Sequence, residues 1–289
     1  MLNKVVMKLA NFGLKKFPEY FEPLEEILRL ADMKVLYEVY VGRMILFSIL
    51  TFFSVFLSLT IMLSLIFHVP LWMSLPGSLA LGVAGAGLLL FFFHSYPYQI
   101  LSKKKASIEN NLPFALNHMS AIAAAGVPPS IIFKLLSTVK EYGEITNESK
   151  KIIRNMETFG MDMISAIKEV ADRTPSRKFK EFLYSMISII ETGGDLKRFL
   201  KGVTRDALFE YRLRRERYLS TLTTYADFYT AILIAAPLFF IAILSVMSMI
   251  GGTISGFSII DLMKLGIYVF IPLLNIVFIL FVHMTQPAV

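Results

Sequence analysis

Long apolar stretches without charge alternate with charged segments along the chain. Asp, Glu, Lys and Arg are absent from residues 44–102, 228–260 and 265–289. A helix rises about 1.5 Å per residue and needs roughly 20 apolar residues to cross a hydrocarbon core of about 30 Å. The first stretch has room for two such helices and each of the others for one. The pattern therefore predicts four transmembrane helices.

Proline and short polar connections set the limits of these spans. We expect the first span at 44–67 and the second at about 78–96, because Pro97 lacks the amide hydrogen that a continuing helix needs. The connections within the two pairs of spans are expected at 68–77 and at about 251–263.

The segment 103–227 differs from the spans because it carries 21 Lys or Arg and 15 Asp or Glu residues. Its apolar residues recur at helical spacing, and strand signals are nearly absent. Helix starts are expected at Asn111, Ser130, Asn147, Asp162, Thr174 and Asp195, which are capping residues or stand beside a first-turn proline. The last helix can run unbroken into the third span. The fold class is therefore all-α, a polytopic membrane protein with a cytoplasmic six-helix bundle.

The N-terminal segment mixes seven basic and six acidic residues with apolar residues at roughly helical spacing. These apolar residues are Phe17, Phe21, Leu24, Ile27, Leu28 and Leu36. The expected domains are thus an amphipathic segment at 1–43, two spans at 44–102, the helical domain at 103–227 and two further spans at 228–289. No short apolar run with a cleavage site opens the chain, so we expect membrane entry through an internal span.

Basic residues flank the spans asymmetrically. Arg43 precedes the first span, Lys103 follows the second, and Arg212, Arg214, Arg215 and Arg217 precede the third, whereas the connection 68–77 has no Lys or Arg. Lys and Arg near span ends stay in the cytoplasm. The sequence therefore predicts a multi-pass protein of the cell (inner or cytoplasmic) membrane, with both termini and the middle domain cytoplasmic.

Small residues recur every fourth position in the second span, at Ser78, Gly82 and Ala86. Such a stripe lets another helix approach closely, so its expected role is helix packing. The nearby glycines do not follow a strand, which argues against a dinucleotide site.

Composition removes several classes of chemistry. The chain is 55% hydrophobic and 18% charged and has no cysteine, which excludes disulfides and thiolate metal sites. Neither a P-loop nor H-E-x-x-H nor G-x-S-x-G occurs, and the four histidines are dispersed. We therefore predict no catalytic, cofactor-binding or metal-binding residue, and no enzyme. Asn275 is the notable polar residue of the fourth span and is expected to bond across helices.

Two segments carry more specific motifs. The first reads Leu112-Pro113-x-x-Leu116 and then Ala124-Ala125-Gly126-Val127-Pro128, and the second reads Glu191-Thr192-Gly193-Gly194-Asp195-Leu196 and then Phe199-Leu200. Together they resemble the two helix-turn-helix signatures of the type II secretion F domain, whose family comprises assembly-platform proteins of type IV pili, type II secretion, Tad pili and archaeal pili and archaella. The layout of spans is similar to that of the Tad-type and archaeal members.

The resemblance implies a membrane scaffold without enzymatic activity. It implies a hexameric secretion ATPase and pilin-like subunits as partners, with the spans, especially the face of Gly82 and Ala86, packed around pilin or sister subunits. ATPase contacts are expected at the two turns, which comprise Gly126, Val127, Pro128 and Pro129, and Glu191, Thr192, Gly193, Gly194, Asp195 and Leu196. Many family members carry two such domains and this chain has room for one, so a second copy or a paralogue is an expected partner.

The repeat, the arginine cluster and the function each have more than one interpretation. A shift of 67 residues superposes Leu116 on Leu183 and Gly126 on Gly193, which indicates either two similar hairpins or two unrelated amphipathic ones. The four arginines act either as a topology signal that also contacts anionic membrane lipids, or as a partner site. A transporter or channel is the main alternative function, although its spans would be expected to hold ionisable groups. A nucleic-acid binder is disfavoured because aromatic residues do not interleave with the basic ones.

Overall fold

A computed structural model describes residues 2–65, 70–251, 253–254 and 257–285. The chain forms two compact units, Met1–Thr204 and Arg205–Val289, and each is described by itself.

Unit 1 begins with two amphipathic helices, α1 (Leu2–Lys16) and α2 (Pro18–Leu30). Phe21, Leu24 and Leu28 of α2 are buried against the start of α3 (Tyr37–Leu65). The expected apolar stripe is therefore confirmed in its middle but wrong at its ends, where Phe17 and Leu36 are exposed. At Phe17 the reason is Pro18, which disfavours helical geometry at the residue before it and divides the segment into two helices. Leu36 lies after the end of α2, in the connection to α3, and so does not continue the face of the helix.

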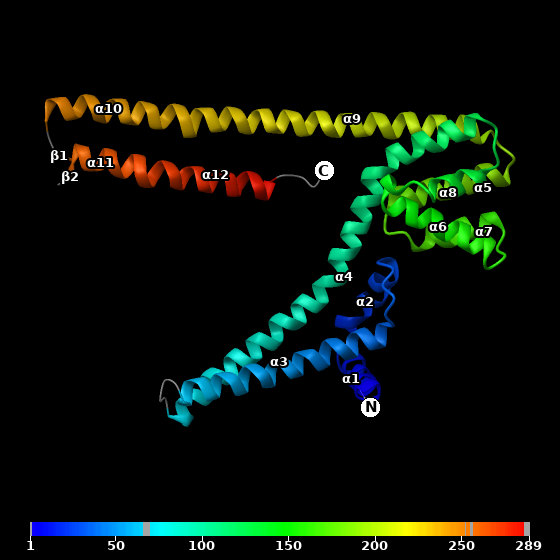
Figure 1. The fold of residues 1–289 in the computed structure, drawn as a ribbon, viewed down its shortest axis with the longest axis horizontal. Helices are drawn as coiled ribbons and strands as arrows, with labels where there is room; N and C mark the ends of the chain where they lie inside the picture. The colour runs from blue at the N-terminus through cyan, green and yellow to red at the C-terminus, as the bar shows by residue number, and fades with distance from the viewer. Residues whose placement is uncertain (1, 66–69, 252, 255–256, 286–289) are drawn as a thin grey trace. The chain divides into compact units, whose positions relative to one another are not determined.

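Helix α4 (Leu71–Ala124) is 54 residues long, and Figure 1 shows it as one continuous ribbon. Trp72, the second residue of this helix, is 75% exposed. The predicted stop at Pro97 and the predicted helix start at Asn111 are both wrong, because Pro97 and Pro113 lie inside the helix. A proline removes one hydrogen bond and bends the axis, and the regular turns on either side hold the helix together.

Helices α3 and α4 pack along each other, and the stripe of small residues lies in their interface. The hydroxyl oxygens of Thr60 and Ser78 are hydrogen-bonded at 2.8 Å. Gly82 is buried, and a Cβ added to it would lie 3.3 Å from the ring of Phe52 in α3. Ser78 and Gly82 are thus packed against the chain's own first span, while Ala86 is half-buried and lines a cavity. Packing of this face around pilin or sister subunits stays a prediction.

The end of α4 joins a helical bundle. Its further members are α5 (Pro129–Leu136), the short 3-10 helix η1 (Lys140–Tyr142), α6 (Glu144–Glu157), α7 (Met163–Arg173), α8 (Arg177–Glu191) and the start of α9 (Leu196–Phe228). The core consists of side chains that recur at helical spacing, including Leu116, Met119, Phe133, Ile152, Ile167, Phe179, Leu183 and Met186. Each helix of the bundle buries one face, as its apolar stripe predicts.

The predicted helix caps are partly confirmed. The carboxylate of Asp162 accepts a hydrogen bond from the amide of Ser165 at 2.9 Å, and Asp195 accepts one from Arg198 at 3.0 Å. Asn147 is not a cap, because α6 begins three residues earlier, after Gly143. Gly143 has φ +55°, and a Cβ there would lie 2.6 Å from the Ser107 hydroxyl, so this start requires glycine.

The predicted start at Thr174 is also displaced. Ser176 caps α8, accepting a hydrogen bond from the amide of Phe179 at 3.3 Å. Both residues are competent caps, and the proline at 175 leaves Ser176 as the residue with extended backbone directly before the helix.

In unit 2 the helical run from Asp195 continues without a loop, as predicted. A π-helical segment, η2 (Tyr229–Ala235), follows α9 and leads into α10 (Ala236–Ile250). A two-residue antiparallel pair, β1 (Thr253–Ile254) and β2 (Phe257–Ser258), precedes α11 (Ile259–Leu265), the π segment η3 (Gly266–Phe270) and α12 (Ile271–Thr285). Pro237 lies where η2 passes into α10, and a local π-helical adjustment is one way in which a proline is accommodated inside a membrane-spanning helix.

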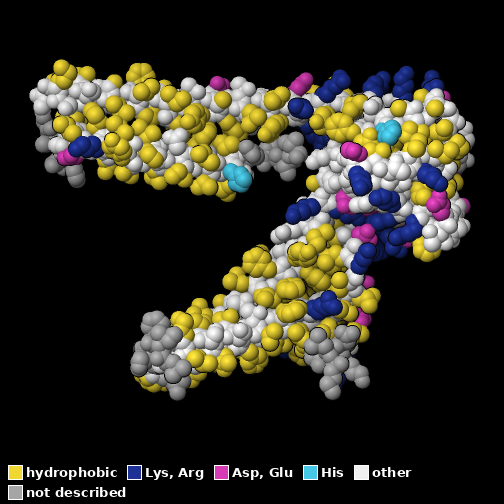
Figure 2. Space-filling view, in the orientation of Figure 1, with side chains coloured by type: hydrophobic (Ala, Val, Ile, Leu, Met, Phe, Trp, Pro, Cys, Tyr) yellow, Lys and Arg dark blue, Asp and Glu magenta, His cyan; other side chains and the backbone are white. Residues whose placement is uncertain are grey.

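Four helical stretches are long and apolar enough to cross a membrane: Tyr37–Ser64, Ser74–Ala124, Leu196–Ile250 and Ile259–Thr285. Figure 2 shows mainly hydrophobic side chains along α3 and α10–α12. Exposed apolar surface of this extent needs lipid around it. The all-α fold and the four spans are confirmed, and the protein is a multi-pass membrane protein. The cytoplasmic side of the bundle and the domain limits stay predictions.

Candidate functional site

The first predicted contact turn joins α4 to α5. Gly126 adopts φ +74° and its amide donates to the carbonyl of Ala123 at 3.0 Å, which closes the end of α4. Pro128 then has extended backbone and Pro129 occupies the first turn of α5. Gly126 and Pro128 are exposed, while Val127 and Pro129 are half-buried. The turn therefore has a rigid backbone and presents mainly apolar side chains to solvent.

The second turn joins α8 to α9 and shares the positive φ and the hydrogen bond of its glycine with the first turn. Gly193 adopts φ +65°, and its amide donates to the carbonyl of Ile190 at 3.2 Å. A further hydrogen bond joins the amide of Gly194 to the carbonyl of Ile189 at 2.8 Å. Glu191, Thr192 and Asp195 are exposed, as are both glycines, and Leu196 is half-buried. Space around Gly126 and Gly193 is open, so positive φ rather than crowding accounts for glycine at both positions.

The two turns lie at the same end of the bundle (Figure 1). Thr204 of α9 donates a hydrogen bond to the carbonyl of Leu116 in α4 at 2.9 Å. Leu116 comes eight residues before the end of α4, and Thr204 comes eight residues after the start of α9. Because α4 runs toward its turn and α9 runs away from its own, both turns extend beyond this contact on one side.

The 67-residue repeat is matched in backbone and burial at several positions. Leu116 and Leu183 are buried, as are Met119 and Met186, and Phe133 and Leu200. Gly126 and Gly193 have positive φ at the equivalent place. Similarity of the helix crossing angles in the two hairpins stays a prediction.

A buried charge cluster, which no sequence motif indicates, joins the N-terminal segment to the bundle. Glu148 of α6 is fully buried, 2.9 Å from the ammonium group of Lys104 and 3.2 Å from that of Lys151. Lys151 also lies 2.7 Å from Asp32, and Lys104 donates to the carbonyl of Leu30 at 3.2 Å. The lysine runs at 103–105 and 150–151 were visible in sequence, but the burial of Glu148 between them was not.

Two groups of this cluster have displaced pKa values. Burial raises the pKa of Asp32, but the hydrogen bond from Lys151 and the charges of Lys151, Lys104 and Arg154 outweigh it, so this pKa lies below its ordinary value. Burial lowers the pKa of Lys151, but Glu148 and Asp32 outweigh it and raise this pKa above its ordinary value. Both groups therefore remain charged near neutral pH.

The four arginines project from α9 in unit 2, and all are exposed. Successive helical residues are rotated by about 100°, so positions 212, 214, 215 and 217 are distributed around the whole circumference. Arg215 donates to the hydroxyl oxygen of Tyr211 at 3.5 Å. The arginines thus form a collar around α9 and do not gather on one face.

Asn275 links two helices of unit 2, as its position predicted. The hydroxyl of Tyr229, in the π segment η2, donates to its side-chain oxygen at 3.3 Å, and its amide group donates to the carbonyl of Ile271 at 2.9 Å. Across the described residues, no group of three His, Cys, Asp or Glu side chains is arranged as metal ligands would be.

Comparison with known proteins gives a match over the bundle and the following helix. Residues 115–244 match the family of protein F of the type II secretion system (T2SS). An uncharacterized protein of Methanocaldococcus jannaschii is 28% identical over 186 residues, which is 63% of this chain and 31% of that protein. Flagella accessory protein J of Methanococcus voltae is 29% identical over 153 residues, 53% of this chain and 27% of that protein.

A second uncharacterized protein of Methanocaldococcus jannaschii is 28% identical over 207 residues, 71% of this chain and 58% of that protein. The chain therefore spans less than two thirds of the length of each of these relatives. No solved structure matches the chain.

Proposed function

Since residues 115–244 match the family of protein F of the type II secretion system, we propose that the chain is the membrane platform of a type IV pilus-like or type II secretion-like machine. In this role it couples a cytoplasmic hexameric secretion ATPase to the assembly or export of pilin-like subunits. The similarity to flagella accessory protein J supports a filament-building machine.

The extent of the matched domain carries this proposal. It begins at residue 115, inside the bundle, and ends at residue 244, inside the third candidate span. The helical run Leu196–Ile250 connects the second turn to that span without an intervening loop. In this proposal, work that the ATPase does at the turn reaches the third span through this helical run.

The two turns supply the docking surface of the proposal. They lie at one end of the bundle, their glycines are exposed, and Glu191 and Asp195 give the second turn charge that the apolar first turn lacks. The excess of basic residues in 103–227 supports a cytoplasmic bundle, which is where an ATPase is found. Pairing with a second copy or a paralogue stays part of the proposal.

Substitution at both turns tests the docking surface. We expect Val127→Arg combined with Glu191→Arg to reduce capture of the cell's secretion ATPase by the tagged full chain about tenfold or more, since central interface positions contribute most of a binding energy. Capture is quantified from detergent-solubilised membranes.

Glu141→Arg is the matched control, because Glu141 is exposed on η1, at the opposite end of α5 from the first turn. Capture by this variant should stay within about twofold of the unmodified chain, as expected for a change outside an interface. Equal capture by the turn variant and the control would reject the turns as the docking surface. Absence of ATPase from all captures would reject the platform itself.

A further inference from the structure

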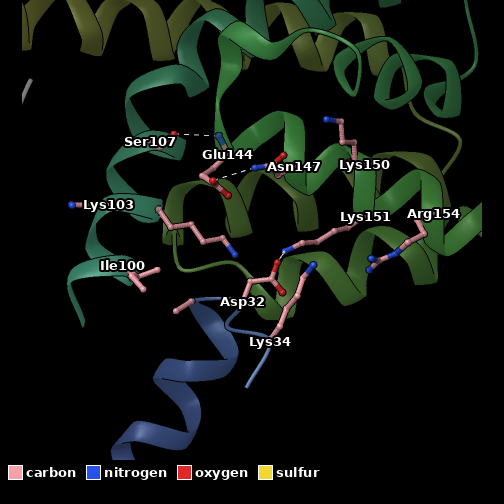
Figure 3. Close-up of a pocket in the computed structure, with 12 residues that line it drawn as sticks. Asp32, Lys34, Ile100, Lys103, Ser107, Glu144, Asn147, Lys150, Lys151 and Arg154 are labelled. Carbon is pink, nitrogen blue, oxygen red and sulfur yellow. Dashed lines mark hydrogen bonds and ion pairs between the residues drawn. The ribbon is translucent and has the colours of Figure 1, made fainter. Parts of the chain in front are cut away.

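A basic cavity of about 710 Å³ lies on unit 1, apart from both turns (Figure 3). Its walls come from the segment after α2, the middle of α4 and the first three turns of α6. Six basic side chains line it: Lys34, Lys103, Lys104, Lys150, Lys151 and Arg154. Asp32 and Glu144 are the acidic residues of the lining. The cavity therefore has a strong excess of positive charge.

Two of the six cations are fixed and neutralised. Lys104 is 95% buried at its side chain and pairs with the buried Glu148, and Lys151 bridges Glu148 and Asp32. Their ion pairs hold α4, α6 and the N-terminal segment together. The floor of the cavity is thus rigid before any ligand arrives.

Among the described residues, three of the other four cations lack an anionic partner, whereas the charge of Arg154 lowers the pKa of Asp32. Within the described part of the chain, Lys34, Lys103 and Lys150 form no ion pair, and Arg154 lies 6.0 Å from the ring of Phe159. Figure 3 shows Lys34 directed toward Lys151 and Arg154. Like charges that line one cavity repel each other, and a bound anion would reduce that repulsion.

A neutral donor stands among these cations. The hydroxyl oxygen of Ser107 accepts a hydrogen bond from the amide of Glu144 at 3.2 Å, which leaves its hydrogen free to donate. Ammonium, guanidinium and hydroxyl donors in one cavity form the set that binds phosphate oxygens. The ligand chemistry is therefore that of a phosphate group.

The place of the cavity along α4 indicates the source of that phosphate. Lys103 is the first charged residue after the second span, and Ile100, one helical turn before it, also lines the cavity. The cavity therefore begins where the apolar surface of α4 ends, at the depth where lipid headgroups meet the hydrocarbon core. We propose that the basic cavity binds the phosphate of an anionic lipid headgroup.

The test compares two triple variants of the purified full chain in detergent. Lys34→Gln/Lys103→Gln/Lys150→Gln removes the unpaired lysines of the cavity. Lys105→Gln/Lys140→Gln/Lys168→Gln removes the same charge from exposed lysines outside it, and Lys105 lies two residues from Lys103. Neither variant touches the buried pairs, so both are expected to fold, which circular dichroism checks.

Binding is measured by native mass spectrometry with phosphatidylglycerol, phosphatidylcholine and inorganic phosphate as separate probes. We expect phosphatidylglycerol to bind the unmodified chain, the cavity variant to lose at least about tenfold in affinity, and the control variant to lose less than about threefold. Phosphatidylcholine and inorganic phosphate should bind far more weakly.

Three results would overturn the proposal. Equal losses of phosphatidylglycerol affinity in both variants would show that binding depends on the overall charge of the protein and not on the cavity. Tight binding of inorganic phosphate alone would assign the cavity to a soluble ligand instead of a lipid. Unchanged phosphatidylglycerol binding in the cavity variant, with loss of ATPase capture, would assign it to a protein partner.

Discussion

At the scale of single residues, Glu148 has the environment with the largest energetic consequence. Its carboxylate is fully buried and contacts two ammonium groups, so its charge is compensated within the protein. Removing one partner from a buried ion pair leaves the other charge without solvent and without compensation. Exposed pairs lack this penalty because water replaces the lost partner.

Glu148→Gln should therefore destabilise unit 1 by about 3–5 kcal/mol, because it leaves Lys104 buried and charged. Glu157→Gln is the matched control, since Glu157 pairs with Lys134 at 3.0 Å and both side chains are more than half exposed. The control should cost less than about 1 kcal/mol. Unfolding of the two variants, followed by circular dichroism, measures the difference, and equal stabilities would contradict the role of the buried cluster.

The ion pair of Asp32 with Lys151 should make the attachment of the N-terminal segment to the bundle dependent on pH. Its folded-state pKa lies below the ordinary value, so its carboxylate stabilises the fold above that ordinary value, and the contribution is lost as pH falls through the folded pKa. Acidification below about pH 4 should thus increase amide hydrogen exchange around residues 31–36. The effect is small, because the Asp32 side chain is 59% exposed.

Asp32→Asn is the control for this pH effect. Asp32 has φ +57°, a conformation that asparagine also adopts readily, so the backbone is preserved while the titrating group is removed. This variant should show the faster exchange already at neutral pH, with less change on acidification. An unchanged pH profile in the variant would assign the effect to other carboxylates.

At the scale of elements, the side chains that cap helices were predictable from sequence. The continuation of a helix through a proline was not. Asp162 and Asp195 cap helices because the cap needs only local geometry. Pro97 was expected to end a helix, but the packing of α3 along α4 supports the turns on both sides of it. Gly143 was not expected to start α6, because the reason for glycine there is the hydroxyl of Ser107, a residue distant in sequence.

The distance between the arginine collar and the third span favours a topology signal over direct contact with lipid headgroups as the role of these arginines. Arg217 precedes the uncharged stretch that starts at Phe228 by roughly 16 Å of helix, which exceeds the Debye length of about 10 Å. Direct contact with headgroups is therefore weak for a helix perpendicular to the membrane. A topology signal remains effective at this spacing, because it operates over about 15–20 residues from a span.

Replacing Arg212, Arg214, Arg215 and Arg217 by Glu should consequently alter the insertion of the last two spans in part of the molecules. The chain has no cysteine, so Thr285→Cys provides a single labelling site at the end of α12. We expect an impermeant maleimide to label this site in intact cells only when the arginines are replaced. Unchanged labelling together with lost ATPase capture would instead indicate partner binding.

At the scale of the whole molecule, the fold class and the similarity to the type II secretion system protein F family were predictable because both depend on local patterns. Charge-free stretches predicted the four spans, and the turns around Gly126 and Gly193 predicted the match over residues 115–244. The basic cavity was not predictable, because it depends on Lys34, Lys103 and Lys151, which only the tertiary structure brings together. The cover of Gly82 by Phe52 likewise needed the pairing of α3 with α4.

The position of Trp72 at the first turn of α4 gives the protein an internal optical reporter. It is the chain's one tryptophan, and its indole is largely exposed. Indole favours the boundary between lipid and water, and its emission colour follows the polarity around it. Fluorescence excited at wavelengths that tyrosine does not absorb therefore originates at that end of α4, and quenchers placed at known depths in a bilayer would locate it.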